Sequence, residues 1–121
     1  MGVFSGAFSD PVQREVRYWW SRVDQAAAWR LYDDATASLV RIENHSQAPT
    51  TEAYQSATDK LKTAAEQGLA QAMLDYGELL CLGPEKFIRR DRAAGQYWIE
   101  SAALMGHPRA QLAACQKKCG F

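Results

Sequence analysis

The chain contains little of what marks several common classes of protein. It has only three cysteines, and so few thiols, odd in number, do not make a disulfide framework. No apolar run approaches the roughly 20 residues that a membrane-spanning helix needs. Fourteen basic residues balance fourteen acidic ones, whereas nucleic-acid-binding proteins usually carry a basic surplus. The sequence therefore predicts neither a membrane span nor a nucleic-acid partner.

The start of the chain, "MGVFSGAFSD", lacks the features of a targeting segment. It contains no Lys or Arg and only a broken apolar stretch. A secretory signal, by contrast, has a basic start followed by a continuous apolar core. We therefore expect a cytoplasmic protein.

Motifs that carry chemistry are equally scarce. The two histidines, His45 and His107, are far apart in the sequence and give no metal signature. The segment "GPEKFIRR" lacks the glycine spacing of a phosphate-binding loop, so a solvated loop is a simpler interpretation than an anion site. No serine stands in a recognisable nucleophile motif. We expect no enzyme: no catalytic residue, no cofactor, no metal ion and no small-molecule substrate.

Glycine and proline are sparse, and good helix formers fill most of the sequence between them. No segment alternates apolar and polar residues in the way that strands do, so the sequence predicts an all-α protein. The expected helices begin after the caps Asp10, Thr50 or Thr51, and Asp91, or at Ala70 and Pro108, and they end at Gly68, Gly83 and Gly106.

The continuity of the first helix is open. Its apolar stripe runs from Val12 to Ala27, but the apolar residues from Leu31 to Ile42 lie about 100° further round the helix. Either one long helix packs different faces along its length, or the helix breaks near residues 32–33. We favour the break, because Asp33 or Asp34 would cap a new helix.

The second half of the chain repeats itself at a shift of 38 residues, which carries Cys81 onto Cys119. Small alanines allow two helices to approach closely, and glycine can adopt the left-handed turn that ends a helix. A repeat of this length predicts helical hairpins stacked as a solenoid. The recurring residues are Ala64, Ala65, Gly68, Ala72, Leu74 and Cys81, matched by Ala102, Ala103, Gly106, Ala110, Leu112 and Cys119.

One whole repeat, from Ala72 to Gln111, resembles the Sel-one-like repeat (SLR) family, relatives of the tetratricopeptide repeats (TPR). The usual Gly-x-Gly-Val loop of the family is replaced here by "GPEKFIRRD". The matching residues are Tyr76-Gly77, Leu80, Gly83, Asp91, Ala93 or Ala94, Tyr97-Trp98, Ala102-Ala103, Gly106 and Ala110-Gln111.

The resemblance implies a fold and a domain organisation. The fold is a right-handed α-solenoid of five to six stacked antiparallel helices. Residues 49–121 form the repeats, and residues 1–48 form an N-terminal helical region that is either a degenerate repeat or a cap.

The resemblance also implies a function in protein–protein interaction. Members of the family mostly act as adaptors or scaffolds, and some are linked to bacterial secretion or to toxin–immunity pairs. The first helices of stacked hairpins line a concave surface that suits a partner helix or peptide. We therefore expect another protein as the partner, bound by an adaptor or by a dedicated binder such as an immunity protein.

An aromatic and basic cluster in the N-terminal region is the first candidate for a binding surface. Tyr18 and Trp29 lie off the first apolar stripe, and Arg17 stands beside Tyr18. Aromatic and arginine side chains are typical of interface hot spots. Packing of these aromatic residues against later helices is the alternative.

A second candidate surface lies within the repeat. Asp75, Glu78 and Leu79 lie off the apolar stripe of the helix that contains Ala72, Tyr76 and Leu80. We expect them on the open face of the stack.

The three cysteines leave several interpretations open. Cys81, Cys115 and Cys119 are most simply small residues in or near the core. Alternatively, Cys81 and Cys119 form a disulfide, because they occupy equivalent repeat positions that stacked first helices bring close. The alternative function is a small thiol-dependent redox or enzymatic protein, which needs a thiol of lowered pKa beside a base.

Overall fold

The computed structural model describes residues 26–116 and 119, which contain five helices and no strand. The all-α prediction is confirmed for these residues. The helix expected after Asp10, with Arg17 and Tyr18, lies outside them. The helices are α3 (Ala26–Glu43), α4 (Thr51–Glu66), α5 (Ala70–Leu82), α6 (Arg92–Leu104) and α7 (Pro108–Cys115).

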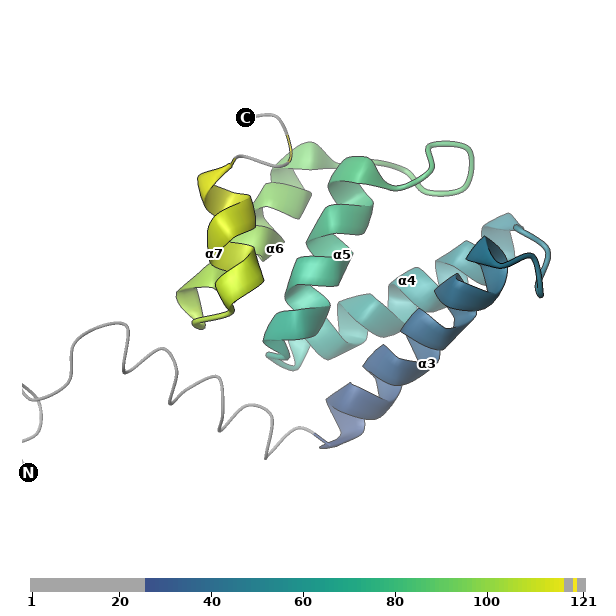
Figure 1. Ribbon diagram of the computed structural model, residues 1–121, viewed down its shortest axis with the longest axis horizontal. Helices are drawn as coiled ribbons and strands as arrows, with labels where there is room; N and C mark the ends of the chain where they lie inside the picture. The colour runs from purple at the N-terminus through teal and green to yellow at the C-terminus, as the bar shows by residue number, and fades with distance from the viewer. Residues whose placement is uncertain (1–25, 117–118, 120–121) are drawn as a thin grey trace, which may run out of the picture.

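The helices follow one another in a row from α3 to α7 (Figure 1). Each packs mainly against the next helix in the sequence. The partners within each pair α3–α4, α5–α6 and α6–α7 run in opposite directions (Figure 1). Packing between sequence neighbours is what stacked helical hairpins require.

Helix α3 is continuous through Asp33 and Asp34, so the predicted break at this point is wrong. Ala28, Ala35 and Ile42 are spaced by seven residues and are all buried, which gives α3 a single stripe facing its neighbour. Both aspartates are exposed. Tertiary packing of one face decides where a helix continues, and here it outweighs the tendency of aspartate to start a new one.

Four predicted helix starts are confirmed, among them that of α5 at Ala70, and the other three have a local cause. The hydroxyl of Thr50 accepts a hydrogen bond from the N–H of Ala53 at 3.1 Å, and a carboxylate oxygen of Asp91 accepts one from Ala94 at 3.1 Å. Pro108 is the first residue of α7. Each of these residues satisfies or removes a backbone donor that has no partner within its own helix.

The turns after α4 and α6 are the same structure at equivalent repeat positions. Gly68 and Gly106 have positive φ angles of 92° and 95°. In each turn two backbone N–H groups donate back to the last carbonyls of the helix, which is the pattern of a Schellman cap. The donor–acceptor pairs are Gly68–Ala65 and Leu69–Ala64 in one turn, and Gly106–Ala103 and His107–Ala102 in the other.

Replacing Gly106 by valine should lower the free energy of unfolding by about 1–3 kcal/mol, because a β-branched residue is strained at positive φ. Gly68→Val should cost a similar amount, since the two turns are equivalent. Denaturant unfolding of both variants measures this. An unchanged stability in either variant would contradict the shared turn.

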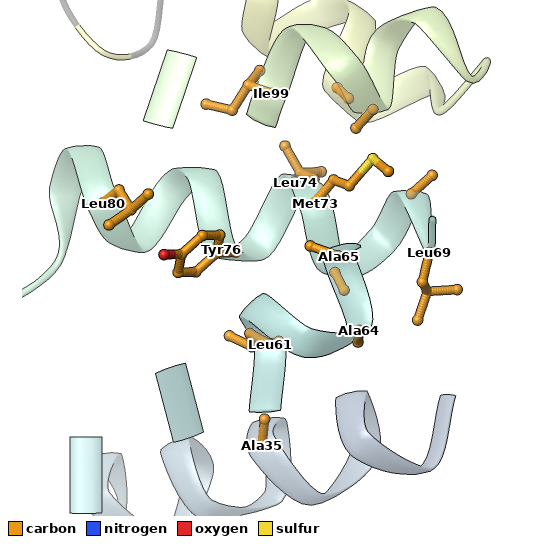
Figure 2. Close-up of a cluster of buried hydrophobic side chains, with 14 of the residues drawn as sticks. Ala35, Leu61, Ala64, Ala65, Leu69, Met73, Leu74, Tyr76, Leu80 and Ile99 are labelled. Atoms are coloured by element: carbon orange, nitrogen blue, oxygen red, sulfur yellow. The ribbon is translucent and has the colours of Figure 1, made fainter. Parts of the chain in front are cut away.

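The core lies where α4, α5 and α6 meet (Figure 2). Leu61, Leu69, Leu74 and Ile99 are its largest fully buried aliphatic side chains. Small alanines fill the remaining contacts between helices, so that the helices approach closely. These alanines are Ala57, Ala64, Ala65, Ala70, Ala72, Ala102 and Ala110.

The segment 83–91, expected as a solvated loop, is held against the helices. Ile88 is buried, and the ring of Phe87 stacks on that of Tyr54 with centroids 5.1 Å apart. The Nε of Arg90 donates to the carbonyl of Gly83 at 2.8 Å. Phe87 and Ile88 thus hold the middle of the loop against the helices, and the Arg90–Gly83 bond joins its two ends.

Candidate protein-binding groove

A groove of about 350 Å³ lies between α3 and α5. The sequence-predicted Asp75, Glu78 and Leu79 all contribute to its walls, so the structure brings this predicted set together. The described residues that line the groove are Leu39, Glu43, Leu61, Asp75, Glu78, Leu79, Leu82, Gly83 and Pro84.

Leucine side chains from three helices form the apolar part of the groove. Leu61 of α4 is fully buried. Leu39 of α3 and Leu79 of α5 are half-buried and pack against the core. Leu82, at the end of α5, is 52% exposed. Leu82 therefore extends the half-buried apolar surface into solvent. A partner protein can cover this exposed apolar area and exclude water from it.

Carboxylates form the polar part of the groove. Glu43 comes from α3, and Asp75 and Glu78 come from α5, while the described lining contains no Lys, Arg or His. The helices α3 and α5 also end here, at Glu43 and Leu82. The three carboxylates make the described lining acidic, whereas the carbonyls of Gly83 and Leu82 at the end of α5 lie 2.8 and 3.5 Å from nitrogens of the Arg90 guanidinium.

Asp75 is held in the groove wall by hydrogen bonds from two helices. The hydroxyl of Tyr32 in α3 donates to its Oδ2 at 2.7 Å, and Nε2 of Gln71 donates to its Oδ1 at 3.1 Å. From α7, Nη2 of Arg109 lies 3.8 Å from the same Oδ1. Asp75 thus links α3, α5 and α7 on one side of the stack.

His107 extends this network to the start of α7 and is only 3% exposed. Its Nδ1 accepts a hydrogen bond from the backbone N–H of Ala110 at 3.3 Å, so this nitrogen carries no proton. The ring hydrogen then lies on Nε2, which donates to Oε1 of Gln71 at 2.6 Å. The neutral imidazole is the form that satisfies both contacts.

Burial sets the protonation states of the network. It raises the pKa of Asp75, against the hydrogen bonds from Tyr32 and Gln71 that favour the carboxylate. Burial, and then the hydrogen bond to Asp75, raise the pKa of Tyr32, so the phenol keeps its proton and donates it. Burial, and then the charge of Arg109, lower the pKa of His107 below 6.5.

Mild acid should destabilise the protein through His107. Because its folded pKa lies below the ordinary 6.5, the unfolded chain binds the proton more readily, and stability is lost as the pH falls through the window below 6.5. The free energy of unfolding should fall by at most about 1.4 kcal/mol per pH unit there. Denaturant titrations at a series of pH values measure the slope.

His107→Asn is the matched control, because asparagine also caps a helix but does not titrate. Its stability should depend less on pH in the same window. The raised pKa of Asp75 acts in the opposite direction, since protonation of that carboxyl favours the folded state. Asp75 is present in both proteins, so parallel curves would contradict the assignment to His107.

The N-terminal candidates fare differently from those in the repeat. Trp29 packs edge-on against Tyr32, with ring centroids 5.5 Å apart, and lies partly buried against the core. This is the packing alternative that the sequence left open for it. Arg17 and Tyr18 lie outside the described residues, so their role in binding stays a prediction.

Sequence reasoning missed the α3 side of the groove and the role of His107. Leu39 and Glu43 lie on α3, and the helices beside α3 depend on how the hairpins stack. The spacing of apolar residues in the sequence does not predict this stacking. The spacing of Gln71 and Asp75, four residues apart on one helix face, is the one local signal of the network.

Two of the three cysteines form a disulfide. Cys81 and Cys119 are bonded, with Cα atoms 5.1 Å apart, and both are buried. The disulfide alternative therefore replaces the interpretation of these two as separate core thiols. Cys115 is a free and exposed cysteine. Within 26–116 and 119, no group of three or more His, Cys, Asp or Glu side chains is placed to hold a metal ion.

None of the described helices has the length and the apolar character needed to cross a membrane.

Comparisons with known proteins give no relative for this chain. No protein family, no curated protein and no solved structure matches it. The resemblance to Sel-one-like repeats therefore stays a prediction that rests on the residues quoted for it.

Proposed function

We propose that this chain is a protein–protein interaction module whose binding site is the groove between α3 and α5. The observation that carries the proposal is the gathering of apolar and acidic side chains from distant parts of the sequence into one groove, with Leu82 half-exposed at its edge. Helix-lined grooves of this kind take a helix or an extended segment of another protein.

The repeat organisation supports a concave binding side. The equivalent turns at Gly68 and Gly106 support a stack of hairpins, which we propose to be a right-handed solenoid of the SLR or TPR type. The first helices of the hairpins are then α3, α5 and α7. The contacts from Tyr32 and Arg109 to Asp75 support a common side for these three helices.

The N-terminal cluster extends the proposed surface. Trp29 contacts Tyr32, and Tyr32 contacts Asp75 in the groove wall, which links the N-terminal part of α3 to the groove. Arg17 and Tyr18 are proposed to add contacts there. A binder with this arrangement would serve as an adaptor or as a dedicated partner of one protein, as bacterial immunity and secretion-associated proteins do.

Leu82→Ser should abolish capture of the partner from the source cells. We expect Leu82 to be a hot spot of the interface, and truncating a hot-spot residue typically costs about 2 kcal/mol or more, which is roughly thirtyfold in affinity. Because Leu82 is half-exposed, the helical spectrum and the melting temperature should not change. Quantitative mass spectrometry of the captured proteins measures the loss.

Leu104→Ser is the matched control for this test. Leu104 is 68% exposed, on α6, and does not line the groove. A partner that is kept by Leu104→Ser and lost by Leu82→Ser supports the groove. A partner that both variants retain would place the binding site elsewhere.

A further inference from the structure

The charge of the groove restricts what can occupy it. Glu43, Asp75 and Glu78 line it, and the described lining contains no Lys, Arg or His. Arg109 approaches Asp75 from α7, but its side chain is 67% exposed and its Nη2 is 3.8 Å away, which makes a weak, screened ion pair. Arg90 covers the end of α5, and its charge is balanced by Glu85 at 2.7 Å. An acidic segment would meet a lining that carries three carboxylates, so charge complementarity favours a basic one.

The apolar lining adds a second requirement. Leu39, Leu79 and Leu82 offer side-chain surface on both sides of the groove, and Pro84 also lines it. A volume of about 350 Å³ lies at the small end of the roughly 300–1,000 Å³ range of ligand pockets. The groove therefore takes one or two apolar side chains of a bound helix or extended segment.

The shape and the charge together point to one occupant. We infer that the groove binds a segment of a partner protein that inserts one or two apolar side chains and places Lys or Arg on either side of them. The apolar side chains contact the leucines, and the basic groups lie against Glu43 and Glu78 at the rim. This inference rests on the proposed function and specifies the chemistry of the partner at that same site.

Selection from random peptides displayed on phage tests the inference without a known partner. The wild-type protein is the bait, and peptides that also bind Leu82→Ser are removed by counter-selection, so that only peptides dependent on the groove remain. We expect the retained peptides to combine an apolar residue with flanking Lys or Arg, and to be depleted in Asp and Glu.

The affinities of the selected peptides then test the carboxylates directly. The double variant Glu43→Gln/Glu78→Gln should bind them roughly fivefold more weakly, the size expected for two ion pairs at the protein surface. Added salt should weaken binding to the wild type more than to this variant, because salt screens exposed charges. The matched control is Glu66→Gln/Glu100→Gln, which removes two exposed carboxylates outside the groove lining and should bind like the wild type.

The outcomes separate the two proposals. Peptides that depend on the groove but are neutral or acidic, or that bind the Glu43→Gln/Glu78→Gln variant unchanged, would overturn the inference and leave the groove as a binding site. Failure to retain any groove-dependent peptide would count against both. Equal weakening by the control double variant would show a general effect of net charge, which also overturns the inference.

Discussion

Replacing Gly95 by alanine should destabilise the protein by about 3 kcal/mol, although alanine is the better helix former. At this position α6 crosses α5 so closely that an added Cβ would collide with Sγ of Cys81 and would lie 2.7 Å from the carbonyl oxygen of Gly77. Backbone and a buried sulfur cannot move aside cheaply, so the overpacking cost lies at the upper end of the usual 1–3 kcal/mol. Denaturant unfolding of the two proteins measures the difference.

Two further variants separate packing from helix propensity. In an exposed helix position Ala→Gly costs up to about 1 kcal/mol, and Ala93→Gly, on the exposed side of the same helix, should show this ordinary effect. Gly77→Ala tests the crossing from the other side, because its Cβ would lie 2.7 Å from the carbonyl oxygen of Gly95 and 2.8 Å from Cγ1 of Ile99. A neutral or stabilising result for both Gly77→Ala and Gly95→Ala would show that the helices are further apart.

Helix ends could be read from the sequence because the chemistry that sets them is local. The side chains of Thr50 and Asp91 reach backbone groups only three residues away, and Gly106 supplies a turn within its own few residues. The continuity of α3 could not be read in this way. It depends on whether a neighbouring helix covers the face of α3 that carries Ala35 and Ile42. That coverage is a property of the packed protein.

Residues at equivalent positions of the repeat are not equally buried. Leu74 and Leu112 occupy the same repeat position, yet Leu74 is fully buried and Leu112 is 59% exposed. Burial depends on which helices lie beside a residue, and a terminal hairpin has different neighbours from an internal one. The same limit applies to the groove.

Three of the nine described residues that line the groove were predicted from the sequence. Asp75, Glu78 and Leu79 could be found because they lie off the apolar stripe of their own helix. Leu39 and Glu43 approach them only because α3 and α5 lie on a common side of the stack, and no spacing within α3 contains that information.

Breaking the disulfide should destabilise the protein even more than the substitutions at the helix crossing. Cys81 and Cys119 are 38 residues apart, and closing a loop of that length removes chain entropy from the unfolded state worth about 4 kcal/mol. Cys119→Ser should lower the free energy of unfolding by about this amount and the melting temperature by roughly 10 °C or more. Calorimetry in the absence of reductant measures both.

Reductant provides the internal control for this prediction, and it also tests the alternative role of the thiols. Dithiothreitol should destabilise the wild type to the level of Cys119→Ser and leave that variant unchanged, whereas Cys115→Ser should behave like the wild type, because Cys115 is exposed and unbridged.

Without reductant, neither Cys81 nor Cys119 should react with iodoacetamide, and Cys115 should be alkylated no faster than an ordinary exposed thiol. Fast alkylation of Cys115, together with a bridge that opens at low reductant, would favour a thiol-dependent redox protein over a binding module. A wild type that reductant leaves unchanged would mean that the two buried sulfurs are not bonded.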